Sequence, residues 1–227
     1  MTFSIAGRCA RTGMLGVAVS SSSPAVAARC AFARAGVGAA MSQNITDPRL
    51  GQKLLGLMQE GKAARTALDQ VVTEAGGNAD FRQLIVIDSK GGTAIHRGPR
   101  SLGIHAGAAG ADCASAGNLL ANDGVPAAIV AGFQRHATLH LGERLIKAMQ
   151  AGLDAGGEAG PVKSAGLLVV DKQSWPLVDL RCDWGDAPIG ELAKLWDVYA
   201  PQMNDYVTRA LDPSSAPAFG VPGDPAR

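Results

Sequence analysis

The chain has 227 residues, of which 47% are hydrophobic and 18% are charged, as in ordinary folded globular proteins. Its 21 Lys and Arg residues nearly balance its 20 Asp and Glu residues, and the sequence holds no long basic run. We therefore expect no nucleic-acid partner and no membrane partner. The sequence also contains no apolar stretch long enough to span a bilayer and no secretory-signal pattern at its start, so we expect a cytoplasmic protein.

The first part of the chain predicts a hairpin, a third strand and then helices. Residues 2–6 and 15–19 show the alternation of strands on either side of a turn, and a further strand is predicted at 36–42. Apolar residues at helical spacing then predict two helices, or one kinked helix, between residues 49 and 75.

From residue 82 onward, strands and helices again come in groups. The run 82–88 is strongly strand-like, and the Gly91–Gly92 turn predicts a hairpin with residues 93–96. Further strands are predicted at 102–105, 112–116, 164–171 and 175–183. Helices are predicted at about 126–134, 139–155 and 189–198. Whether the last helix extends past Pro201 is left open by the pattern.

This order of elements differs from the strict β-α-β alternation of a parallel sheet. It favours antiparallel sheets with helices packed outside them. We find no linker-like stretch before the end of the chain, so we predict a single domain at residues 1–211. Residues 212–227 are rich in Pro, Gly, Ser and Ala, and we expect a loose tail there.

Several blocks of sequence, taken together, resemble one known family. The blocks are residues 1–5, 15–21, 33–39, 81–84, 117–120, 164–169, 178–183 and 188–192. On these blocks the chain resembles domain-of-unknown-function family 1028, which is grouped with the N-terminal-nucleophile (Ntn) hydrolases. The resemblance implies an α+β fold, a four-layer αββα sandwich in which two antiparallel sheets lie between helix layers.

The resemblance directs attention to Thr2 as a catalytic nucleophile. A free α-amino group has a pKa of about 8, so part of it is neutral near pH 7 and can act as a base for the adjacent hydroxyl. Removal of Met1 ahead of a small residue such as Thr2 would expose that amine. The alternative is that Thr2 only starts an edge strand.

The resemblance implies two further catalytic residues, Arg34 and Asn118. Arg34 follows the first hairpin, where related proteins place a cation that stabilises the ionised nucleophile; a surface ion pair is the alternative. Asn118 follows Gly117 at the end of a strand and could donate its amide to an oxyanion, or it could simply form a turn.

Three residues are candidates for substrate binding: Ser21, Gln43 and Arg181. Ser21 could instead satisfy backbone groups near a helix start, and Arg181 could instead join ion pairs with Asp179 and Asp183. The stretch around Gln43 departs from the family pattern, because Asp47 precedes Pro48 and Leu50 stands where a tyrosine is expected.

Two functions are open at this stage. The first is an Ntn-type hydrolase of a small amide or related C–N bond, with a small-molecule substrate, no metal and no organic cofactor. The second is a catalytically silent protein on the same fold that binds a small ligand or forms a homo-oligomer. His136 and His140 have helical metal-ligand spacing, but we expect them on a solvated surface.

Overall fold

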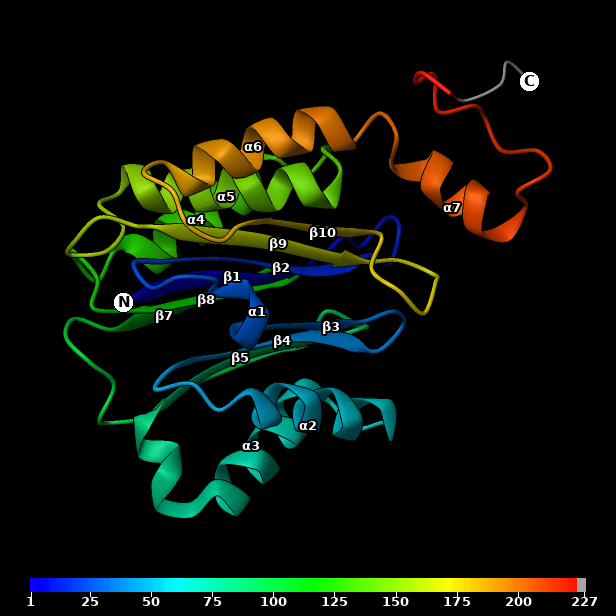
Figure 1. Cartoon of the computed structure of the whole chain (residues 1–227). Helices are drawn as coiled ribbons and strands as arrows, with labels where there is room; N and C mark the ends of the chain where they lie inside the picture. The colour runs from blue at the N-terminus through cyan, green and yellow to red at the C-terminus, as the bar shows by residue number, and fades with distance from the viewer. Residues whose placement is uncertain (224–227) are drawn as a thin grey trace.

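The computed structural model describes residues 1–223, which form four layers (Figure 1). Helices α4 (Val125–Arg135), α5 (Leu141–Asp154) and α6 (Pro188–Tyr199) cover one side of a six-stranded sheet, whose other side faces a four-stranded sheet. Helices α2 (Pro48–Gln59) and α3 (Ala64–Ala75) cover the far side of that second sheet. The α+β, αββα sandwich with two antiparallel sheets is therefore confirmed.

The larger sheet has the strand order β10-β9-β2-β1-β8-β7, and neighbouring strands are antiparallel. Its strands are β1 (Thr2–Arg8), β2 (Leu15–Ser21), β7 (Ala106–Gly110), β8 (Cys113–Asn118), β9 (Ser164–Val170) and β10 (Val178–Cys182). Because β1 lies between β2 and β8, Thr2 begins a central strand. The alternative that Thr2 starts an edge strand is wrong.

The smaller sheet has the order β3-β4-β5-β6, again antiparallel. Its strands are β3 (Ala31–Arg34), β4 (Gly38–Asn44), β5 (Arg82–Asp88) and β6 (Thr93–Arg97). The helices are α1 (Ala27–Cys30), α2 (Pro48–Gln59), α3 (Ala64–Ala75), α4 (Val125–Arg135), α5 (Leu141–Asp154), α6 (Pro188–Tyr199) and α7 (Met203–Leu211), with a 3₁₀ turn at Gly76–Phe81.

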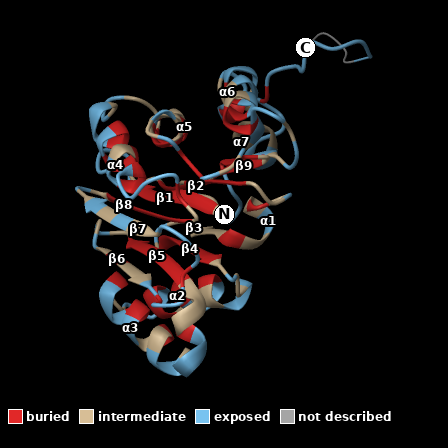
Figure 2. Cartoon of the chain, turned by 90° about the vertical axis from the view of Figure 1, so that its left-hand side faces the viewer, coloured by how far each residue is buried: buried red, intermediate tan, exposed pale blue. Residues whose placement is uncertain are grey.

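Strand alternation assigns each side chain of a strand to one of two cores. In β1, Phe3 and Ile5 join the core beneath α4, α5 and α6, whereas Ala6 joins the core between the sheets. Ile85 and Ile87 of β5 fill that inter-sheet core from the other side. Figure 2 shows the result: buried residues concentrate in the strands and on the helix faces turned toward them.

Most predicted elements are confirmed, with local exceptions. The sequence did not predict α1 and β3, which occupy a run of small residues. The strand expected at 102–105 is wrong, since β7 begins at Ala106 and Gly103 has a φ of +61°. His140, expected on a solvated surface, instead accepts a hydrogen bond from the Gly142 N–H at the start of α5.

The C-terminal segment leaves the four-layer body through α7 (Figure 1). Ala216 is buried, and the Arg209 guanidinium donates to the carbonyls of Pro217 and Ala218, so the start of the predicted tail folds back on α7. Residues 224–227 lie outside the described residues. Among the helices described, each is too short or too polar to cross a membrane.

Candidate functional site

One end of the layer between the two sheets is polar, whereas the rest of that layer is apolar. Strand alternation points the polar side chains into this layer, and all of them are buried. They are Thr2, Ser4, Ser21, Gln43, Gln83 and Asn118. A buried polar cluster is costly unless its members are hydrogen-bonded, so the contacts among these groups determine what the cluster can do.

Two glutamine side chains tie the sheets together at this end. The Gln43 amide accepts a hydrogen bond from Ser4 Oγ at 2.6 Å and donates to Gln83 Oε1 at 2.7 Å. Gln83 Oε1 also accepts from Asn118 Nδ2 at 3.1 Å, and Gln83 Nε2 donates to the Gly117 carbonyl at 2.9 Å. The network thus fixes the orientation of the Asn118 amide.

Thr2 lies at the edge of this network, with only 6% of its surface exposed. It is directly opposite Asn118 in the β1–β8 register, where cross-strand Cβ atoms are about 5 Å apart. Thr2 Oγ1 is 3.4 Å from Ser21 Oγ. The two hydroxyls also converge on one acceptor, because both donate to the carbonyl oxygen of Met1.

A line of polar groups continues from Ser21 to a cation. Ser21 Oγ is 2.9 Å from Ser23 Oγ, and Arg29 Nη2 donates to Ser23 Oγ at 2.5 Å. Arg29 lies on the short helix α1, which the sequence did not predict. Arg29 is therefore a positive charge connected to Thr2 through the hydroxyl groups of Ser23 and Ser21.

The structure does not bring Arg34 and Arg181 to Thr2. Arg34 pairs with Gly38 at the opposite end of β4 from Gln43, which is about 17 Å along a strand, and it donates to Gln59 Oε1. Arg181 is on the edge strand β10, separated from β1 by β9 and β2. Its guanidinium contacts Asp183 at 3.5 Å, so it forms the ion pair given above as the alternative.

Glu158 is a buried carboxylate close to Thr2 that the sequence analysis missed. Glu158 Oε2 accepts a hydrogen bond from the Ser22 N–H at 3.1 Å, whereas Oε1 has no hydrogen-bond partner within residues 1–223. Burial raises the pKa of Glu158 from 4.5 to about 7, and the nearby α-ammonium of Met1 partly opposes that rise. Glu158 lies in the irregular segment between α5 and β9, where no sequence motif marks it.

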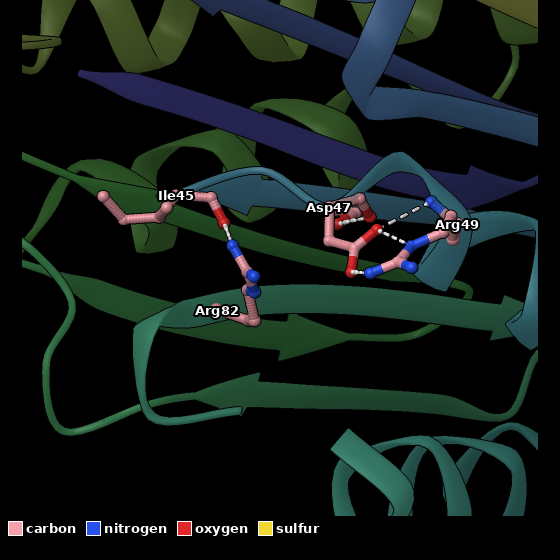
Figure 3. A network of polar contacts seen from close by, with 5 residues as sticks. Ile45, Asp47, Arg49 and Arg82 are labelled. Carbon is pink, nitrogen blue, oxygen red and sulfur yellow. Dashed lines mark hydrogen bonds and ion pairs between the residues drawn. The ribbon is translucent and has the colours of Figure 1, made fainter. Parts of the chain in front are cut away.

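The loop after β4 is held by its own charged residues (Figure 3). The Asp47 carboxylate caps α2 by accepting from the Arg49 N–H at 3.1 Å, and it accepts from the Arg49 guanidinium at 2.8 and 2.9 Å. These bonds lower the pKa of Asp47. Arg82 donates to the Ile45 carbonyl. The Asp47–Pro48 step therefore acts as a helix start, which fixes the loop beside Gln43.

Comparison with known proteins places the chain in a family. Residues 2–192 match the model of a family of unknown function, DUF1028. The chain belongs to the DUF1028 family. A crystal structure of a DUF1028 protein from Silicibacter pomeroyi is 28% identical, covers 90% of this chain and 89% of its own, and superposes with a TM-score of 0.82. No curated protein matches the chain.

Two more distant structures are Anbu proteins, whose name abbreviates ancestral beta-subunit. Anbu from Yersinia bercovieri is 14% identical over 90% of this chain and 97% of its own, with a TM-score of 0.41. Anbu from Hyphomicrobium is 12% identical over 96% of this chain and its whole length (100%), with a TM-score of 0.42. These values are too low to support an argument about function.

In this DUF1028 chain, sequence signals were available for only part of the site. The alternation in β1 already put Ser4 on the same face as Thr2, and Gln83 belongs to a resembling block. Arg29 and Glu158 lacked such signals, because their proximity to Thr2 arises from the packing of α1 and of the segment before β9.

Proposed function

We propose that the protein is an Ntn-type hydrolase that cleaves a small amide or a related C–N bond with Thr2 as its nucleophile. The single observation that carries this proposal is the place of Thr2. Thr2 begins a central strand at the polar end of the inter-sheet layer, where it lies opposite Asn118. Its hydroxyl lies beside that of Ser21. An αββα sandwich in which Thr2 would become the amino-terminal residue on removal of Met1 also supports the relation to Ntn hydrolases.

The proposed reaction begins after the Met1–Thr2 bond has been cleaved. While Met1 is attached, the Thr2 nitrogen is an amide and cannot accept a proton. Once it is free, the neutral α-amine takes the hydroxyl proton as Oγ1 attacks the substrate carbonyl carbon. The amine leaving group departs with that proton, and water then hydrolyses the Thr2 ester to release the acid.

The neighbouring polar groups have distinct proposed roles. Ser21 donates to the Met1 carbonyl oxygen, so after cleavage its hydroxyl is available to a substrate oxygen at the same place. Asn118 is held by Gln83 and offers its amide to the developing oxyanion. Gln43 positions this network through its bonds to Ser4 and Gln83, and Arg29 stabilises charge through Ser23. Arg34 and Arg181 have no part in this mechanism.

Intact-mass measurement and substitution of Thr2 test the proposal. Protein purified from cells should lack Met1 in its active fraction. Thr2→Ala should lower turnover of a panel of small amides by at least about a hundredfold, since it keeps the amine but removes the nucleophile. Thr2→Ser should retain activity. The matched control is Thr12→Ala, a change in the exposed turn between β1 and β2.

Retention of Met1 by active protein would contradict the mechanism, because the base would then be missing. Unchanged turnover in Thr2→Ala would remove Thr2 from the reaction.

A cytoplasmic site of action is part of the same proposal, and the free thiols of Cys9, Cys30 and Cys113 support it, because they are buried without disulfides.

A second candidate function is a silent scaffold that assembles as a homo-oligomer. Exposed apolar side chains gather on α6 and α7, including Val198 at 67% and Leu211 at 59% exposure. If they form an interface, Val198→Asp should lower the mass measured by light scattering. Ile45→Asp, which changes an exposed apolar residue elsewhere, serves as the control.

A further inference from the structure

A cavity of about 370 Å³ lies between the end of α5 and the start of α6. Its volume is within the range of small-molecule sites in proteins. Leu153, Val162, Pro188 and Ile189 supply apolar walls, and Gly160 leaves part of the wall without a side chain. These residues give the cavity an apolar interior, in which a charged group would be poorly solvated.

Glu158 forms part of the wall of this cavity. Only 5% of its surface is exposed, and its Oε1 atom has no hydrogen-bond partner in the described part of the chain. A buried carboxylate oxygen without a partner is costly, so a ligand that donates to it would remove that cost. The other ionisable side chain of the described lining, Asp186, is also acidic, and it is already paired with Lys163.

The segment between α5 and β9, which carries Glu158 and Gly160, connects the cavity to the Thr2 site. Glu158 Oε2 accepts from the Ser22 N–H, and Ser22 follows Ser21, whose hydroxyl is 3.4 Å from Thr2 Oγ1. The Met1 side chain lies against Gly160 of the cavity wall. Met1 therefore contacts both the cavity wall and, through its carbonyl oxygen, the hydroxyls of Thr2 and Ser21.

We propose that this cavity, the Glu158 cavity, binds an organic ammonium group carried on an apolar body and serves as the recognition subsite for substrates of Thr2. The substrates are then small amides that bear an ammonium group. The ammonium donates to the free oxygen of Glu158, and the apolar part of the molecule fills the space beside Val162 and Ile189. The statement about substrates rests on the proposed hydrolase function, whereas the statement about binding does not.

A binding experiment with two probes of equal size tests the cavity. Phenethylamine and 2-phenylethanol have the same apolar ring and differ in the ammonium group. Ligand-observed NMR titration at pH 8 should give at least about tenfold tighter binding of the amine. Glu158→Gln keeps the size of the side chain and should abolish this preference. Asp186→Asn alters the exposed acid of the same wall and should leave it intact.

Equal affinity for the two probes would overturn the proposal, as would an amine preference that survives in Glu158→Gln. Failure of both probes to bind at millimolar concentrations would also overturn it. Thr2→Ala should bind phenethylamine like the unaltered protein, because the hydroxyl of Thr2 lies outside the cavity lining. Hydrolysis that is absent from the unaltered protein, or that survives in Thr2→Ala, would refute the enzymatic proposal alone as long as the amine preference and its loss in Glu158→Gln are observed.

Discussion

Glu158→Gln should stabilise the folded protein at alkaline pH and should have little effect at acidic pH. In the folded state burial raises the pKa of Glu158 to about 7, whereas 4.5 is its ordinary value. Between these two values the unfolded chain releases a proton that the folded protein retains. The free energy of unfolding therefore falls as the pH rises from about 4.5 through about 7. Above that range the folded protein bears the full cost of burying the ionised Glu158 carboxylate.

The size of the effect follows from the difference between the two pKa values. A rise of about 2.5 corresponds to about 3 kcal/mol of destabilisation above pH 7. Glutamine does not titrate, and its side-chain oxygen can still accept from the Ser22 N–H. The variant should then be more stable by up to about 3 kcal/mol at pH 8, which is about 6–12 °C in Tm for a chain of this size.

Urea unfolding of both proteins at pH 4.5 and pH 8 measures this effect. Taking the difference between them at each pH removes the contributions of all other titrating groups. Glu60→Gln, which makes the same change at an exposed glutamate just after the end of α2, is the matched control. If Glu158→Gln is equal to or less stable than the unaltered protein at pH 8, burial of an ionised Glu158 is not costly and the reasoning fails.

Two other substitutions test the contacts around the site. Gln83→Leu removes the acceptor of the Gln43 and Asn118 amides, so buried donors lose their partner; urea unfolding should show a loss of about 2–4 kcal/mol, and a loss under 1 would contradict the network. Asp47→Ala removes the cap that accepts from the Arg49 N–H, so thermal unfolding should show a free energy of unfolding lower by about 1 kcal/mol. An unchanged stability would mean that water replaces the cap fully.

Local patterns in the sequence predicted most elements of the fold, because helices and strands impose short periodicities on apolar residues. The alternation of Phe3 and Ile5 predicted β1, and the strand-like run at residues 82–88 matches β5. The pattern was weak where small residues dominate, since alanine and glycine favour neither face strongly. That is why α1, β3 and the true position of β7 were missed.

The candidate site could be predicted only in part. Thr2, Ser21, Gln43 and Asn118 were identified through the family resemblance, and the structure brings them to one end of the inter-sheet layer. Arg34 was expected beside Thr2 from its place in the chain order. The register of β3 against β4 instead puts it at the opposite end of the smaller sheet.

The sequence by itself indicated the class of fold, since grouped hairpins and amphipathic helices favour antiparallel sheets covered by helices, and the family resemblance implied the four-layer sandwich. Only the tertiary structure decided which polar groups meet. Gln43 and Gln83 reach Ser4 and Asn118 because two sheets stack face to face, and Glu158 reaches Ser22 across 136 positions of the chain. Periodicity reports which face of an element is buried, but it carries no information about which distant element covers that face.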